Sequence, residues 1–205
     1  MLTRTSKNKI NKILEENSNW KVLDIGCGYR PHDKASIIAD AQDFSDYYKD
    51  KKFIQIKEKK LPFKDNEFDF VIASHVIEHV KDFEFFIKEI ERISNKGYIE
   101  LPTRLADNLV FENKTDHIWW FLFDDIKNEL IVSEKKNLID PFISVSMSKT
   151  LEATFRDSLV IELYWEKKIE YKINEKDLYE SFKKISFLKI VKKYLSKKLR
   201  SFIKK

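Results

Sequence analysis

The sequence predicts an α/β protein whose core is a doubly wound, mostly parallel sheet. Over roughly the first hundred residues, short apolar runs alternate with helix-patterned segments, and this alternation is typical of parallel sheets with helical crossovers. Two of the three glycines in the chain, Gly26 and Gly28, directly follow one of these runs. A glycine turn at the carboxyl end of a strand is where a doubly wound sheet binds its ligand.

The composition is that of a folded domain with a heavily charged surface. The chain has 205 residues, of which 42% are hydrophobic, 36% charged and 14% aromatic, so it can bury a sizeable core and is not disordered. Its single cysteine, Cys27, excludes an internal disulfide and fits a reducing compartment. No segment resembles a signal peptide or reaches 18 consecutive apolar residues. We therefore expect a cytoplasmic protein.

The first part of the chain yields one helix and four strands. Ile10, Ile13 and Leu14 recur at helical spacing and predict a short amphipathic helix over residues 6–16. Four apolar runs then predict buried strands, at residues 20–25, 35–39, 53–56 and 68–73. The second of these strands stops at Asp40, and the fourth is the clearest strand of the chain.

A second amphipathic helix and a fifth strand complete the predicted core of the sheet. Residues 80–94 carry an apolar stripe at helical spacing, formed by Phe83, Phe86, Ile87, Ile90 and Ile93. Gly97 follows this helix closely, and we expect it to hold a C-terminal cap position with φ > 0. The next strand covers residues 98–101 and ends at Pro102.

Beyond Pro102 the pattern loosens, and residues 103–157 are predicted to form an insertion. Within it, residues 123–130 are predicted as a helix, with Asp124 and Asp125 in the first turn. Two β-rich runs between residues 158 and 173 predict a hairpin that adds antiparallel strands to one edge of the sheet. The domain is expected to extend over residues 1–182.

The last segment, residues 183–205, has a composition of its own. It contains ten lysines or arginines and no acid, so the rest of the chain carries a net charge of about −5 although the whole chain carries +5. From Phe187 onward, apolar positions recur at helical spacing. A basic amphipathic helix is therefore predicted, which binds a membrane surface or a partner, packs on the body, or stays solvated. A phosphate-binding arm for nucleic acid would need the same charges.

The glycine pair indicates a ligand of the nucleotide type. The first glycine permits a tight turn, and the second lets the backbone approach a ligand where a Cβ would collide. A dinucleotide fingerprint needs a third glycine, but Tyr29-Arg30-Pro31 follows Gly28, so a pyrophosphate site is not expected. On these residues alone, the alternative is a strand-ending turn without a ligand.

Four features occur in a fixed order along the chain. They are VLDIGCG at residues 22–28, Asp40, LPFKDNEFDFVIA at residues 61–73 and HVIEHV at residues 75–80. This ordered set resembles the class I S-adenosylmethionine-dependent methyltransferases, in particular their small-molecule branch of the methyltransferase type 11 pattern, over roughly residues 18–102. The resemblance implies a Rossmann-like fold and S-adenosylmethionine as cofactor. Methyl transfer from a sulfonium requires no metal ion, and the sequence shows no close cluster of Cys and His to hold one.

The resemblance also implies which residues bind the cofactor. They are Asp24, Gly26, Gly28, Asp40, Leu61, Ser74 and His75. The first three would lie against the methionine part, Asp40 would accept the ribose hydroxyls with Asp43 as the alternative, and Leu61 would lie beside the adenine. Ser74 or His75 would face the methionine side. Many relatives carry an aspartate shortly before the Leu-Pro-Phe segment, and here Glu58 is its only substitute.

Two histidines are candidate general bases. His117 lies in the insertion, where this family usually places acceptor-binding residues, and its neighbour Asp116 would support a base near neutral pH. His75 ends the fourth strand at the carboxyl edge, where ligands bind in open α/β sheets. We expect capping, orienting or surface roles for His32 and His79.

Three further residues of the insertion are expected to contact the acceptor. Arg104 would pair with a phosphate or carboxylate, while Trp119 and Trp120 would form an apolar or stacking wall. The alternative is that Arg104 lies on the surface, that both tryptophans belong to the core, and that Asp116 and His117 form a turn.

We expect methyl transfer to an oxygen of a small polar acceptor, such as a sugar, a nucleotide-sugar or a related phosphorylated intermediate of surface-glycan biosynthesis. The alternatives are a lipid-linked or quinone-type acceptor, reached at the inner membrane face through the 183–205 tail, and a non-catalytic cofactor-binding interaction module. We do not expect nucleic acid as the substrate, since Leu101-Pro102-Thr103 occupies the place of the motif for methylating base amines.

Overall fold

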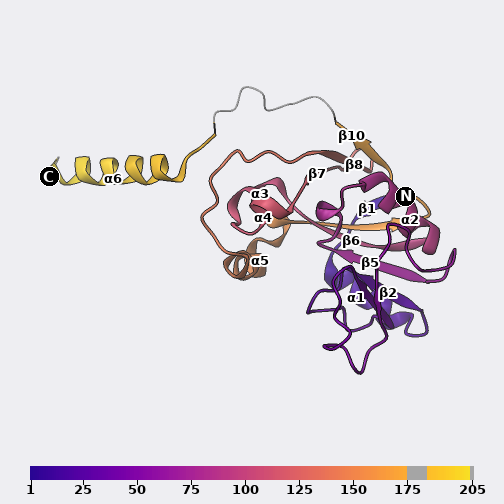
Figure 1. The fold of residues 1–205 in the computed structure, drawn as a ribbon. Coiled ribbons are helices and arrows are strands. Elements are labelled where there is room, and N and C mark those ends of the chain that lie inside the picture. The colour runs from indigo at the N-terminus through magenta and orange to yellow at the C-terminus, as the bar shows by residue number, and fades with distance from the viewer. Residues whose placement is uncertain (175–183, 204–205) are drawn as a thin grey trace.

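The computed structural model describes residues 1–174 and 184–203 and contains a seven-stranded and a three-stranded sheet (Figure 1). The larger sheet has the order β1-β9-β6-β5-β2-β3-β4. Its strands are β1 (Leu2–Arg4), β2 (Val22–Ile25), β3 (Ile37–Asp40), β4 (Phe53–Gln55), β5 (Phe70–Ser74), β6 (Lys96–Pro102) and β9 (Val160–Glu166). The five neighbouring strands β6, β5, β2, β3 and β4 are parallel to one another. Beyond β6, strand β9 pairs antiparallel with β6, and β1 pairs antiparallel with β9 at the edge of the sheet. The predicted mostly parallel, doubly wound sheet is confirmed.

Strand β2 lies at the point where the strand order reverses. It pairs with β3 on one side and with β5 on the other, both in parallel. Chain connections therefore leave β2 and β5 in opposite directions, which opens a crevice at their carboxyl ends. The glycine pair lies directly at this crevice, because Ile25 is the last residue of β2.

Two helices cover opposite faces of the sheet. Helix α1 (Lys7–Glu16), capped by the Ser6 side chain, buries Ile10 and Leu14 against one face. Helix α2 (Phe83–Ile93), capped by Asp82, packs its apolar stripe on the other face. Strand residues alternate between the two clusters, as the period of two requires. The helix predicted from residue 80 begins later because the 3-10 helix η1 (Ile77–His79) and the Asp82 cap precede it.

The helix predicted over residues 123–130 is wrong. Strands β7 (Trp119–Asp124) and β8 (Glu129–Glu134) form an antiparallel hairpin there. The Asp124 carboxylate accepts the N–H groups of residues 126 and 127, and Asn128 has φ +54°. The aspartate thus makes a turn, which short acidic side chains favour as readily as a helix start.

The two β-rich runs of residues 158–173 do not pair with each other as a hairpin. After β9 the chain reverses at Lys167, whose φ is +66°, and β10 (Tyr171–Ile173) joins β8 in parallel. The physical reason is that β1 and β6 occupy both sides of β9. The expected antiparallel edge is therefore formed by β9 and β1.

The expected cap position of Gly97 is also wrong, because this glycine lies inside β6. A Cβ there would overlap the carbonyl oxygen of Val71 on β5 and lie 2.7 Å from Trp165 Nε1. Gly97 is thus a place where a neighbouring strand and an indole approach the backbone closely.

Helices α3 (Arg104–Leu109), α4 (Asn113–Asp116) and α5 (Val145–Leu159) gather beyond the end of β6 (Figure 1). Helix α6 (Phe187–Ile203) stands apart from them. The predicted basic amphipathic helix is α6, while the expected boundary at residues 182 and 183 lies outside the described residues. No helix of residues 1–174 and 184–203 is long and apolar enough to cross a membrane.

Candidate active site

A cavity of about 620 Å³, here called the glycine-loop cavity, opens at the carboxyl ends of β2 and β3. Of the expected cofactor residues, Gly26, Asp40, Leu61 and His75 line it. Glu58, the substitute for the missing aspartate, lines it as well. Its volume lies within the roughly 300–1,000 Å³ of small-molecule sites. The structure therefore brings together residues that the sequence separates by fifty positions.

The glycine loop is fixed by backbone hydrogen bonds to β3 and by one carboxylate. Gly26 has φ +71° and donates its N–H to the carbonyl of Ala39 over 2.7 Å. The oxygens of Asp40 accept the N–H groups of Gly28 and Gln42, each over 2.9 Å. A carboxylate offers about four lone-pair sites, so Asp40 retains acceptor capacity toward the cavity.

Asp24 and Ser74 line a separate cavity of about 230 Å³ on the α1 side, here called the α1 cavity. Asp24 is buried and accepts the N–H of His32 over 2.7 Å. Burial raises the pKa of Asp24 to about 6, against the lowering effects of that hydrogen bond and of the Lys7 charge. A buried carboxylate with so little compensation favours a cationic group in the cavity beside it.

Two expected cofactor residues lie apart from both cavities. Gly28, with φ +49°, is among the lining residues of neither cavity, and Tyr48 donates its hydroxyl to the Gly28 carbonyl over 2.7 Å. Asp43, the alternative to Asp40, accepts the N–H of Ser45 in an exposed turn. Between the two aspartates, the geometry favours Asp40.

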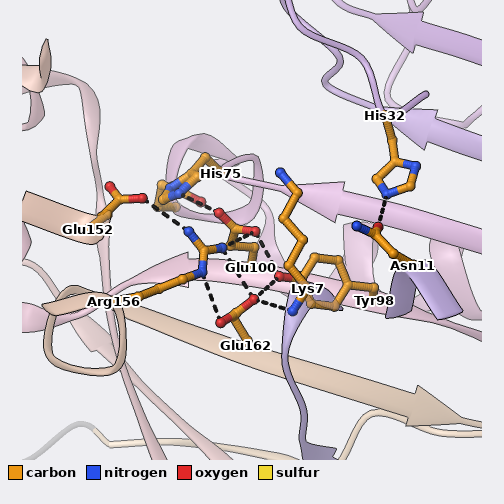
Figure 2. A network of polar contacts seen from close by, with 10 residues as sticks. Lys7, Asn11, His32, His75, Tyr98, Glu100, Glu152, Arg156 and Glu162 are labelled. Carbon is orange, nitrogen blue, oxygen red and sulfur yellow. Dashed lines mark hydrogen bonds and ion pairs between the residues drawn. The ribbon is translucent and has the colours of Figure 1, made fainter. Parts of the chain in front are cut away.

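His75 is held between two carboxylates (Figure 2). Its Nδ1 lies 3.1 Å from Glu78 Oε1 and its Nε2 lies 3.2 Å from Glu100 Oε1. Burial alone would lower the pKa of His75, but the hydrogen bonds and charges of Glu100 and Glu78 outweigh it and raise the pKa to about 10. Because both ring nitrogens then carry protons, His75 has no lone pair with which to act as a general base.

The same network reaches helix α5 through Arg156 (Figure 2). Arg156 lies 2.9 Å from Glu100 Oε2, 3.0 Å from Glu162 Oε2 and 3.2 Å from Glu152 Oε2. Burial would raise the pKa of Glu100, but His75, Arg156 and Tyr98 lower it to about 2. The network thus ties α5 to β6 and to the end of β5.

A third cavity, of about 290 Å³, lies between α5 and the β5–η1 turn and is here called the α5 cavity. It shares His75 and His79 with the glycine-loop cavity. Asp116 and His117 line it, as expected for an acceptor site, and most of its other lining residues come from residues 102–159. The two cavities therefore meet at the two histidines.

The carboxylate that orients His117 is that of Asp107. Asp116, which precedes His117 in the sequence, does not contact the ring in this way. His117 Nδ1 lies 2.5 Å from Asp107 Oδ1, whereas the Asp116 side chain accepts from Thr115. Since a carboxylate only accepts, Nδ1 carries a proton, and the tautomer that this contact favours has its lone pair on Nε2. Asp107 lies on α3, ten residues before His117, and no sequence signal distinguishes it from other helical aspartates.

Arg104, Trp119 and Trp120 are not brought to the α5 cavity. Trp120 is buried in β7, and the Arg104 guanidinium lies 5.7 Å from its ring. Trp119 donates its indole N–H to the carbonyl of Val80 over 2.8 Å. The alternative in which the tryptophans belong to the core fits their positions.

One cluster departs from the expectation that no Cys or His residues gather closely. Glu78, His79 and His117 each offer a ligand atom, and the three atoms lie within 4.8 Å of one another. The sequence conceals this cluster because His117 is 38 positions from His79.

Comparison with known proteins finds similarity over the part of the chain that contains the glycine loop. Residues 23–99 match the model of a methyltransferase domain. An uncharacterized protein of Methanocaldococcus jannaschii is 33% identical over 130 residues, which are 57% of this chain and 51% of that protein. The chain therefore spans about half the length of this relative.

Two of the solved structures similar to this chain are S-adenosylmethionine-dependent methyltransferases. The one from Mesorhizobium loti is 10% identical with a TM-score of 0.43, over 77% of this chain and 96% of that chain. The one from Aquifex aeolicus is 14% identical with a TM-score of 0.41, over 76% and 87%.

Proposed function

We infer that this chain, whose residues 23–99 match a methyltransferase domain, is a class I S-adenosylmethionine-dependent methyltransferase that methylates an oxygen of a small polar acceptor. The acceptor class we propose is a sugar, a nucleotide-sugar or a related phosphorylated intermediate of surface-glycan biosynthesis. The observation that carries the proposal is the α5 cavity, which adjoins the glycine-loop cavity at His75 and His79. Its lining includes Glu112, Lys149 and Glu152, and such charged and polar groups suit a hydroxylated ligand.

S-adenosylmethionine supplies an electrophilic methyl carbon on a sulfonium centre. The residues of the chain position it: Asp40 holds acceptor oxygens toward the glycine-loop cavity, and Asp24 offers a buried carboxylate to a cationic group. In the α5 cavity, the Nε2 lone pair of His117 supplies the basic nitrogen that activation of a hydroxyl needs. Asp107 fixes the tautomer of this ring and stabilises positive charge on it.

The test measures turnover and cofactor binding separately. The full chain is incubated with S-adenosylmethionine and a panel of sugars and nucleotide-sugars, and products are detected by mass spectrometry. His117→Ala should lower kcat/KM by about 10²- to 10⁴-fold and leave the Kd for the cofactor, measured by calorimetry, within twofold. His32→Ala, which alters a histidine outside the α5 cavity, is the matched control. Loss of cofactor binding together with turnover would assign His117 a structural role.

A second acceptor class, lipid-linked or quinone-type, is favoured by one feature of α6. Six of its large apolar side chains are exposed, namely Phe187, Leu188, Ile190, Tyr194, Leu195 and Leu199, and lysines lie among them. We propose that α6 binds an anionic membrane surface at the cytoplasmic face. Salt-sensitive binding to vesicles containing phosphatidylserine, lost on deletion of residues 187–205, would support this. Methylation of quinone precursors but of no sugar would select this acceptor class.

The proposal of an enzyme has its own test against a non-catalytic module. Calorimetry with millimolar S-adenosylmethionine should show one binding site per chain. A flat titration would overturn methyl transfer for either acceptor class.

A further inference from the structure

We infer that Glu78, His79 and His117 bind a divalent transition-metal ion at the wall of the α5 cavity, and that this ion holds and activates the acceptor oxygen. The activating role rests on the proposed function, whereas the site itself does not. The three ligand atoms lie within 4.8 Å of one another. The fold brings the segments together through the N–H of Ile118, which donates to the carbonyl of Glu78 over 2.8 Å.

Both imidazole rings of the cluster are oriented by an acceptor at Nδ1. His79 Nδ1 lies 2.9 Å from the backbone carbonyl of Asp116, and His117 Nδ1 lies 2.5 Å from Asp107 Oδ1. Because these partners only accept, each Nδ1 carries a proton, and the tautomer that these contacts favour has its lone pair on Nε2. Metal-bound histidines are typically oriented in this way, by a carbonyl or a carboxylate on the far nitrogen.

The buried oxygen of Glu78 is the second, independent sign of a ligand. The Glu78 side chain is fully buried and its Oε1 lies 3.1 Å from His75 Nδ1. Its Oε2 is buried and has no hydrogen-bond partner within the part of the chain that the structure describes. A buried carboxylate oxygen without a partner is strongly unfavourable, and a cation bound by this carboxylate and the two imidazoles would satisfy it.

The donor set selects the kind of ion. Two imidazole nitrogens and one carboxylate oxygen suit Mn²⁺, Fe²⁺, Co²⁺ or Zn²⁺, whereas Mg²⁺ and Ca²⁺ prefer oxygen ligands. Ligands about 2.1 Å from one ion at a tetrahedral angle lie about 3.4 Å apart, so the cluster must contract slightly. His79, the exposed member of the cluster, can make that adjustment.

Three protein ligands leave coordination positions open, which is the usual arrangement of a catalytic metal. His79 and His117 line the α5 cavity, so an acceptor hydroxyl there can take an open position. Bound to the ion, the hydroxyl loses its proton to water more readily. The oxygen then forms a bond to the methyl carbon while the carbon–sulfur bond breaks, and the electron pair of that bond stays on sulfur in S-adenosylhomocysteine. With the ion bound, the Nε2 lone pair of His117 is used in coordination, so His117 then acts on the acceptor through the ion in place of acting as the general base.

The first experiment measures the site without any turnover. The metal-depleted full chain is titrated calorimetrically with MnCl₂, ZnCl₂ and MgCl₂, and bound Mn²⁺ is followed by electron paramagnetic resonance. We expect one Mn²⁺ or Zn²⁺ per chain and an affinity for Mg²⁺ at least tenfold weaker. Glu78→Gln, His79→Ala and His117→Ala should each weaken Mn²⁺ binding at least tenfold, while His32→Ala leaves it unchanged.

Substitution of the exposed His79 keeps the test valid if the variants at buried positions fail to fold, which circular dichroism will reveal. Asp107→Asn should weaken binding by about 10- to 100-fold, as the loss of an orienting partner does. Binding of less than half an equivalent, or equal affinities of wild type and His79→Ala, would overturn the site.

The second experiment separates the ion from the proposed acceptor. Product formation is compared for metal-depleted and Mn²⁺-reloaded chain, with S-adenosylmethionine binding measured in parallel. A tenfold or greater gain on reloading supports activation through the ion. Stoichiometric metal with metal-independent methylation would overturn the activating role alone. Metal binding with no methylated sugar would overturn the proposed acceptor and leave the site standing.

Discussion

Replacing Gly26 by alanine tests whether the glycine loop is shaped by sterics as the structure indicates. Gly26 has φ +71°, and a Cβ there would overlap Val76 Cγ2 and lie 3.2 Å from Val76 Cγ1. The left-handed conformation costs an L-residue roughly 1–2 kcal/mol, and forcing a methyl group into a packed site costs roughly 1–3 kcal/mol more. Gly26→Ala should therefore lower the free energy of unfolding by about 2–5 kcal/mol.

Gly28→Ala is the matched control, because it changes the same loop by the same atom. Gly28 also has positive φ, +49°, but a Cβ there would meet no described heavy atom within 4 Å. Only the backbone term of roughly 1–2 kcal/mol should apply. Gly26→Ala should in addition weaken S-adenosylmethionine binding, because Gly26 and Val76 both line the glycine-loop cavity.

The assay is urea unfolding of both variants, with cofactor affinity measured by calorimetry. Val76→Ala removes the two γ-carbons that the new Cβ would meet, so it should recover most of the packing loss when combined with Gly26→Ala. Equal destabilisation by the two glycine variants, or no recovery in the double variant, would refute the steric reasoning.

Three further predictions concern buried groups elsewhere in the sheet. Because burial raises the pKa of Asp24 from 3.8 to about 6, its ionisation opposes folding, and the free energy of unfolding should fall between about pH 4 and pH 6. Asp24→Asn should remove this fall and stabilise the cofactor-free chain by up to about 3 kcal/mol at pH 8. If urea unfolding gave the same pH profile of stability for the wild type and the variant, this prediction would be wrong. Burial likewise raises the pKa of Cys27 to about 12, so iodoacetamide at pH 8 should label the native thiol roughly 1,000-fold more slowly than the urea-unfolded one; comparable rates would show an accessible thiolate. Gly97→Ala should destabilise the chain by about 3 kcal/mol through its overlap with the Val71 carbonyl, and a stability change below about 0.5 kcal/mol would mean that β5 and β6 separate easily at this point.

The glycine loop and the cavity beside it could be predicted because their signals are local. A strand of four apolar or buried residues, a glycine with positive φ and an aspartate ending the next strand all lie within twenty positions, from Val22 to Asp40. Each requirement concerns a residue type at its own position. The structure then needs only the strand order to bring Gly26 and Asp40 to one cavity.

The α5 cavity and its surroundings could not be predicted in the same detail, because they depend on contacts between residues that are far apart in the sequence. The sequence predicts that Trp120 stacks on the acceptor, but its side chain is buried in β7, which pairs with β8. Asp107 orients His117 only because α3 packs beside the segment before β7, and Gly97 is required by an indole 68 positions away. In each case the partner is chosen by packing that no local pattern encodes.

The turn after β5 contributes His75 to both the glycine-loop cavity and the α5 cavity. His75 has φ +55°, a conformation that costs a non-glycine residue roughly 1–3 kcal/mol and persists where the surroundings enforce it. Here Glu78 and Glu100 contact both ring nitrogens, so the His75 ring in the wall shared by the two cavities is held in place.

The charges of this network bear on what the wall can hold. Two cationic side chains, His75 and Arg156, face four carboxylates, those of Glu78, Glu100, Glu152 and Glu162. The carboxylate farthest from Arg156 along this chain of contacts is Glu78, and its second oxygen is the one left without a partner. A dication bound there would balance the two excess negative charges at the point where compensation by the protein is weakest. Removal of one of these two charges by Glu152→Gln should therefore leave a metal site at Glu78 weakened but present, whereas Glu78→Gln should abolish it.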